Sequence, residues 1–380
     1  MTTHEDRTVY DCIILGTSPV CMMEAHYQCR MGQRVLMIDS AKEAGGAWRD
    51  VELFGFEEVE IGAHIMRHWR KGYRYIENVL GIPMTRMQPE PFWILPKYGP
   101  MPTRTPCAHV WNLVLFPALG RFFSRAGLQE VLRNPKQTVF VPLVISLMWF
   151  WRFVKVGAPR ARYPMGGAPR FIRRLRALLN HDSVRILTET TALEICVQES
   201  AKLVHVRTDR ATLQARRLCI TSQSRLNHIR GESGVLNLTP ISADTKHLHM
   251  LVEDKAERLF AFARFHQDEI FNMISDISDY ATHFRREKPT CKLIAAWCSS
   301  EFQDSESHVM RAFIHAKANN LIGPEARLLD YKVSVYRSTE LQEQDRIAIK
   351  RQFGEFVEIL ETENLTENIA HYFDRWTQAN

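Results

Sequence analysis

The sequence predicts an α/β fold that opens with a Rossmann-like βαβ unit and continues into a mixed helical and antiparallel-sheet domain. Two apolar strand-like runs, residues 10–15 and 34–38, flank a helix-like stretch that ends at Gly32. Between about residues 236 and 320, several runs alternate apolar and polar side chains, as antiparallel strands with one buried face do. The first pattern predicts a parallel sheet, and the second predicts a separate antiparallel one.

The turn after the first run has the features of a dinucleotide-binding site. It reads Gly16-Thr17-Ser18-Pro19-Val20-Cys21 and leads into the predicted helix, whose free N–H groups and dipole favour a pyrophosphate. The usual fingerprint has three glycines, of which only Gly16 is kept. Ser18 and Cys21 are small, so they hinder a close approach without forbidding it. We expect Gly16, Thr17 and Ser18 to bind a pyrophosphate; the alternative is an α/β unit without a ligand.

An acidic residue and a Gly-Gly segment follow the second run. Asp39 lies twenty-three residues after Gly16, close to the spacing expected of a ribose-binding acid, and Gly45-Gly46-Ala47-Trp48 comes next. This order resembles the motif of two-dinucleotide-binding-domain flavoproteins, in which the acid leads into a Gly-Gly turn beside FAD. The resemblance implies FAD as the cofactor, with Asp39 at the adenosine ribose and Gly45, Gly46 and Trp48 lining its cleft.

Two later segments resemble members of the same superfamily. Gly62-Ala63-His64-Ile65 is similar to the Gly-Pro-His segment of UDP-galactopyranose mutases, which implies a catalytic position for His64 near the isoalloxazine ring. A packing histidine is the alternative. Tyr163-Pro164-Met165-Gly166-Gly167, followed by a predicted helix at 169–179 and strands at 184–189 and 192–195, resembles the passage that returns amine-oxidase-like flavoenzymes to their FAD domain.

The last part of the chain resembles the closing segment of the mutases. Residues 351–356 lead into 361–365 and a predicted final helix at 366–376. The resemblance implies that Arg351, with a catalytic role, and the Asn364-Leu365 backbone contact the flavin; a surface arginine is the alternative for Arg351. Lys350 replaces the glycine that the family has before the arginine, and the first turn also resembles the Rab GDP-dissociation inhibitors, which use this fold as a binding scaffold.

Composition fits an enzyme-sized globular protein. The 380 residues are 45% hydrophobic and 24% charged, with a net charge of +6. The basic run 170–176 has the spacing of a solvated helix face, and no nucleic-acid module is apparent.

The eight cysteines form no Cys-x-x-Cys pair and the N-terminus is polar, which predicts reduced thiols in a cytoplasmic protein. The pairs His64/His68 and His247/His249 have no additional nearby ligand, so no metal site is expected.

The resemblance predicts a discontinuous FAD-binding domain, residues 1–85, 160–235 and 320–380, and a substrate domain, residues 86–159 and 236–319. Within the latter, the run 139–151 is strongly apolar but has only thirteen residues, whereas a spanning helix needs about twenty. We expect a buried helix there. The alternatives are the wall of a substrate tunnel, or peripheral membrane contact through residues 110–155.

The function predicted first is that of an FAD-dependent oxidoreductase, in which a hydride passes from a small or apolar substrate to flavin N5. A mutase-like sugar-nucleotide isomerase and a non-catalytic binding scaffold are the alternatives. Gly-x-Ser-x-Gly and phosphate-loop motifs are not found, so acyl transfer and nucleotide hydrolysis are not indicated.

Overall fold

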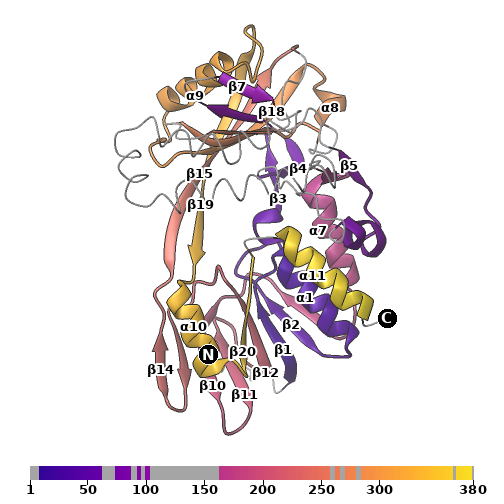
Figure 1. Ribbon diagram of the computed structural model, residues 1–380, viewed down its shortest axis with the longest axis vertical. Helices are drawn as coiled ribbons and strands as arrows, with labels where there is room; N and C mark the ends of the chain where they lie inside the picture. Colours follow the sequence, from indigo (N-terminus) through magenta and orange to yellow (C-terminus); the bar gives the residue numbers. More distant parts are fainter. Residues whose placement is uncertain are drawn as a thin grey trace, which may run out of the picture.

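The computed structural model describes residues 8–61, 73–86, 92–95, 99–102, 162–256, 262–265, 270–279, 284–362 and 365–378. Two large sheets lie at opposite ends of the molecule, and a layer of smaller elements lies between them (Figure 1). This arrangement confirms the prediction of an α/β protein with a parallel and an antiparallel sheet.

The first sheet is built around parallel strands in the order β9-β2-β1-β12, with β20 beside the carboxyl-terminal half of β12. An antiparallel extension, β11-β10, joins the amino-terminal half of β12; β13 then pairs with β10 in parallel, and β14 pairs with β13 antiparallel. The strands are β1 (Val9–Leu15), β2 (Val35–Ile38), β9 (Val184–Leu187), β10 (Ala192–Gln198), β11 (Leu203–Thr208), β12 (Thr212–Thr221), β13 (His228–Gly231), β14 (Gly234–Asn237) and β20 (Val357–Leu360).

Helices cover both faces of the parallel strands, which explains their continuous apolar sequences. On one face, α1 (Pro19–Arg30), α7 (Gly167–Leu178) and α11 (Leu365–Gln378) pack with Cys12 and Ile14 of β1. On the other face, α10 (Glu343–Phe353) packs with Ile13. The predicted helices after the first strand, at 169–179 and at 366–376 are therefore confirmed, with bounds that differ by a few residues.

The second sheet has the order β19-β15-β18-β17-β16-β6-β7 and is antiparallel except between β16 and β6. Its strands are β6 (Phe92–Leu95), β7 (Gly99–Pro102), β15 (Ile241–Glu253), β16 (Phe262–Phe265), β17 (Phe271–Asp276), β18 (Cys291–Cys298) and β19 (Arg327–Glu340). The helix α9 (Glu306–Ala318) covers one face through Val309, Ala312 and Phe313, while α8 (Phe284–Glu287) contacts the other face through Phe284.

The two longest strands connect the sheets. β15 and β19 pair along their whole length, from Ile241 opposite Glu340 to Glu253 opposite Arg327, and form a ribbon that runs from one sheet to the other (Figure 1). Residues 327–340 therefore join the second sheet, although the predicted boundary at residue 320 grouped them with the first domain. Local sequence does not reveal this membership, because pairing with β15 joins residues far apart in the chain.

Smaller elements lie between the sheets. The hairpin of β3 (Asp50–Leu53) and β4 (Phe56–Glu60) turns at Phe54 and Gly55, which both have positive φ, as a type I′ turn requires. β5 (Met84–Arg86) pairs with β8 (Arg162–Pro164), and two short helical turns, η1 (Gly46–Trp48) and η2 (Tyr75–Val79), pack against the first sheet's helices. The hairpin shares a core with the second sheet through Leu53, Phe56 and Val59.

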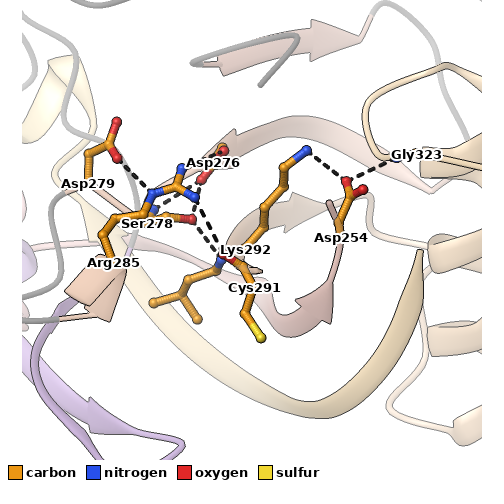
Figure 2. Close-up of polar contacts among 9 residues, drawn as sticks. Asp254, Asp276, Ser278, Asp279, Arg285, Cys291, Lys292 and Gly323 are labelled. Atoms are coloured by element: carbon orange, nitrogen blue, oxygen red, sulfur yellow. Dashed lines mark hydrogen bonds and ion pairs between the residues drawn. The ribbon is translucent and has the colours of Figure 1, made fainter. Parts of the chain in front are cut away.

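A polar network ties the end of β15 to neighbouring segments (Figure 2). The Lys292 ammonium lies 2.7 Å from Asp254 Oδ2, which also accepts a hydrogen bond from the Gly323 amide at 3.0 Å. Nearby, Arg285 donates to Asp279 at 2.9 Å and pairs with Asp276. The Lys292–Asp254–Gly323 contacts join β18 and the end of β15 to the connection between α9 and β19, and the Arg285 contacts join α8 to the end of β17.

Across the described ranges, no helix combines the length and apolarity needed to cross a bilayer. The predicted membrane-contact segment, residues 110–155, lies outside the described residues.

Candidate functional site

The carboxyl ends of the parallel strands bring several predicted residues to one edge of the first sheet. β1, β2, β12 and β20 run in the same direction, so the segments that follow them emerge together. Gly16 follows β1, Asp39 follows β2, Ser222 follows β12 and Thr362 follows β20. Ser222 and Thr362 are joined by their hydroxyls at 2.9 Å, which links the last two segments directly.

Thr17 and Asp39 connect the first turn to the end of β2. The buried Thr17 donates from its amide to Asp39 Oδ2 at 2.9 Å and from its hydroxyl to the same oxygen. The Ala41 amide donates to Asp39 Oδ1 at 2.9 Å, and the Gly45 amide donates to the Thr17 hydroxyl at 3.1 Å. Asp39 thus holds the first turn and the Gly-Gly segment in place, and its side chain remains partly accessible.

The Gly-Gly segment lies directly against the first turn. Gly46 has φ +59°, and a Cβ atom built on it would lie 3.2 Å from Cα and Cβ of Ser18. Gly45 has φ +136° and would place a Cβ atom 3.3 Å from the Arg49 amide. The positive φ therefore favours glycine at both positions, and a side chain would force neighbouring atoms to shift by a few tenths of an ångström. The structure brings together Gly16, Thr17, Ser18, Asp39, Gly45 and Gly46.

The substituted glycine positions are compatible with an anion at the start of α1. Ser18 is the N-cap, and its hydroxyl accepts from the Cys21 amide at 3.5 Å. Cys21 is fully buried in the core, and burial raises the pKa of its thiol to about 12, so it packs as a neutral apolar group. Within the described part of the chain, no acceptor is found for the amides of Ser18 and Val20. The donor set, the helix dipole and the small side chains therefore fit a pyrophosphate.

A buried ion pair positions the last helix beside α1. Glu24 of α1 is fully buried and accepts hydrogen bonds from Tyr372 and Arg375 of α11, each at 2.8 Å. The Arg375 guanidinium also lies 3.6 Å from the centre of the Tyr27 ring. Leu365, which was predicted to contact the cofactor through its backbone, is the first residue of α11 and follows β20 at the same sheet edge.

Trp48, which was predicted to line the cofactor cleft, connects this edge of the first sheet with the layer between the sheets. Its ring lies 5.1 Å from that of Phe171 on α7. At the start of α7, the Ala168 amide donates to Glu60 Oε1 at 2.5 Å, and the Tyr163 hydroxyl donates to the other carboxylate oxygen. Glu60 is buried, and burial raises its pKa to about 8. Glu60 was not predicted as a site residue from the sequence. Its one local feature is that it is an acidic residue at the end of a short strand in which apolar and polar side chains alternate.

The residue after Glu60 contacts the second sheet. The Ile61 carbonyl accepts a hydrogen bond from His249 Nε2 at 2.9 Å. His247 and His249 are both buried, and burial lowers the pKa of each imidazole, to about 4 for His249. The two histidines are two residues apart on β15, so their side chains lie on the same face of the second sheet.

One predicted site residue lies away from the others in the described part of the chain. Arg351 is exposed near the end of α10, just before β20 begins. It therefore lies at the amino-terminal edge of the parallel strands, opposite the edge that carries Gly16. His64 and Asn364 lie outside the described residues.

Comparison with known proteins supports the same fold. No family model matches the chain, and no curated protein matches its sequence. Many solved structures do match it, among them three that match over nearly the whole of both chains. Reduced UDP-galactopyranose mutase has a TM-score of 0.64 at 12% identity, covering 98% of this chain and 96% of its own. Putrescine oxidase bound to putrescine has a TM-score of 0.61 at 14% identity, covering 98% and 97%.

The third structure is a fatty acid isomerase from P. acnes that produces CLA. Its TM-score is 0.59 at 11% identity, and the match covers 100% of this chain and 99% of that chain. The predicted resemblance to amine-oxidase-like and mutase-like proteins is therefore confirmed at the level of the fold.

Proposed function

We propose that this chain binds FAD at the carboxyl edge of its first sheet and is an oxidoreductase acting on a small or apolar substrate. The observation that carries the proposal is the convergence of the first turn, Asp39 and the Gly-Gly segment. These residues come from three places in the sequence, and Thr17 and Ser18 contact the other two segments directly.

In this proposal, the start of α1 holds the pyrophosphate through the amides of Ser18 and Val20, and Asp39 accepts a hydrogen bond from the adenosine ribose. Gly45, Gly46 and Trp48 line the cleft, and the Leu365 backbone contributes at the start of α11. When bound, FAD supplies the N5 position that accepts a hydride from the substrate. The chain's own contribution is to bind the cofactor, orient the substrate and exclude water.

The buried part of one face of the second sheet favours an apolar substrate over a sugar diphosphate. This face, toward the β3–β4 hairpin, carries Leu251, Leu293 and Ala295, together with the two histidines. Burial keeps both imidazoles neutral near pH 7, so they do not offer the cationic groups that a diphosphate requires. The mutase-like isomerase therefore remains the second candidate and the binding scaffold the third.

The first experiment is the visible absorption spectrum of the purified protein, followed by heat release and mass identification of any yellow ligand. We expect released FAD. A colourless protein that also fails to take up added FAD would contradict the proposal and favour the scaffold. With FAD present, oxygen consumption with substrate would support an oxidase, whereas activity only with reduced flavin would support the isomerase.

Asp39→Ala tests the cofactor site itself. Loss of a charged hydrogen-bond acceptor should weaken FAD affinity about tenfold or more, measured by equilibrium titration. Asp182→Ala, at an exposed position outside the site, is the matched control and should leave the affinity unchanged. Because Asp39 also holds Thr17, Thr17→Val provides a second comparison that keeps the carboxylate but removes one hydroxyl donor. Equal FAD affinity in Asp39→Ala and the control would exclude a ribose-binding role.

A further inference from the structure

Two buried histidines share one face of the second sheet. His247 and His249 lie two residues apart on β15, where His247 pairs with Trp297 and His249 with Ala295 of β18. Their exposed fractions are 5% and 1%. The alternating residues Leu248 and Met250 point to the opposite face, into the core covered by α9. The histidine face is therefore the one that meets the β3–β4 hairpin.

The contact with Ile61 determines the tautomer of His249. A carbonyl oxygen only accepts hydrogen bonds, so His249 Nε2, which lies 2.9 Å from it, carries the proton and donates. Because burial lowers the pKa of this imidazole to about 4, the ring is neutral near pH 7. Its Nδ1 atom then holds an unprotonated lone pair and can only accept a hydrogen bond.

The Nδ1 atoms of both histidines are buried and lack a hydrogen-bond partner among the described residues. Aromatic rings flank His247, with Trp297 at 5.4 Å and Tyr336 at 6.2 Å between ring centres. A buried polar atom without a partner costs free energy, and such atoms in a folded protein call for an explanation. Two of them on one strand face indicate that a ligand supplies the missing donor.

A chain of contacts joins this face to the proposed cofactor site. Gly46 lies against Ser18, and Trp48, two residues later, lies against Phe171 of α7. At the start of α7, the Ala168 amide donates to Glu60, whose neighbour Ile61 accepts from His249. The histidines therefore lie on the face of the second sheet that meets the β3–β4 hairpin, and Figure 1 shows β3, β4 and α7 between the two sheets.

We propose that His247 and His249 are the polar recognition groups of the substrate site, and that His249 Nδ1 accepts a hydrogen bond from a hydroxyl or uncharged amino group on an otherwise apolar substrate. The apolar part packs on Trp297 and Ala295, and the donor group orients the molecule. The inference rests on the proposed function for its location beside the cofactor. The acceptor itself is a property of this chain and can be measured without FAD.

The test is nitrogen NMR of the full chain labelled at histidine, with and without FAD. The probes are primary alcohols from ethanol to octanol and, for each, the methyl ether with the same number of heavy atoms, which has no hydrogen-bond donor. We expect His249 to show a protonated Nε2 and a lone-pair Nδ1, and at least one alcohol to shift the Nδ1 resonance saturably. The matched ether should cause no such shift.

A variant then tests the role of the acceptor. His249→Phe should weaken alcohol binding about tenfold, the value of one hydrogen bond. His228→Phe, on β13 of the first sheet, is the control and should not change the affinity for the alcohol. The wild-type titration does not depend on either variant folding.

Two results would overturn the inference. One is a His249 Nδ1 that is protonated or unaffected by every alcohol. The other is a coordinated shift of both Nδ1 atoms with equimolar zinc and none with alcohols, which would indicate a metal site. FAD retention with no alcohol shift would reject the histidine assignment alone, whereas an alcohol shift in a protein that cannot bind FAD would reject the proposed function alone.

Discussion

At Gly46, the absence of a side chain allows the Gly-Gly segment to touch the first turn. Gly46→Ala would combine a positive φ with a Cβ atom 3.2 Å from Ser18. We expect it to lower stability by about 1–2 kcal/mol through backbone strain and to weaken FAD binding by displacing Ser18. Urea denaturation and FAD titration would measure the two effects.

Gly32→Ala is the matched control for this prediction. Gly32 has φ +77°, but nothing lies within 4 Å of a Cβ atom built there. Gly32→Ala should lower stability about as much as Gly46→Ala does, and it should leave FAD affinity unchanged. Equal FAD affinities in the two variants would show that the contact with Ser18 does not shape the site.

Glu60 makes stability depend on pH. Burial raises its pKa from 4.5 to about 8, so between these values the folded protein retains a proton that the unfolded chain has released. The contribution of Glu60 to the free energy of unfolding should therefore fall as pH rises from about 4.5 to about 8, by at most about 1.4 kcal/mol per pH unit.

Glu60→Gln removes the titrating group and keeps its shape. The difference in unfolding free energy between variant and wild type should shift in favour of the variant as pH rises through this window. Urea denaturation at several pH values measures it, and other titrating groups cancel in the difference. Parallel curves for the two proteins would refute the raised pKa.

At the scale of elements, the buried Lys292–Asp254 pair fixes the end of β15 to its neighbours (Figure 2). Each side chain is 3% exposed, so Lys292→Met should leave an uncompensated buried carboxylate and cost about 3–5 kcal/mol. Adding Asp254→Asn neutralises that charge and should recover much of the loss. Urea denaturation of both variants measures the effect.

The exposed Arg337–Asp244 pair on the β15–β19 ribbon is the control for this prediction. Asp244→Asn should change stability far less than Lys292→Met, because solvent screens an exposed pair. Similar losses at the two sites would show that burial does not decide the strength of the Lys292 contact.

At the scale of the whole molecule, the candidate site depends on contacts between segments that are far apart in the chain. Ser18, Gly46 and Ala168 lie in three different elements, and Ile61 and His249 are 188 positions apart. His249 lies where β15 pairs with β18 in the second sheet, and Ile61 follows directly after the β3–β4 hairpin and accepts its hydrogen bond. The proposed substrate groups and the proposed cofactor site therefore lie on different sheets, with one layer of smaller elements between them.

The opening βαβ unit, its turn, Asp39 and the Gly-Gly segment could be predicted from the sequence alone, because short-range periodicity and glycine requirements are local properties. The helices α7 and α11 and an antiparallel sheet after residue 236 were predicted in the same way. The pairing of β19 with β15, the place of Arg351 at the opposite sheet edge, and the burial of Glu60 and His249 could be learned only from the folded structure. The physical reason is that strand pairing and burial join residues distant in the chain, which local patterns do not encode.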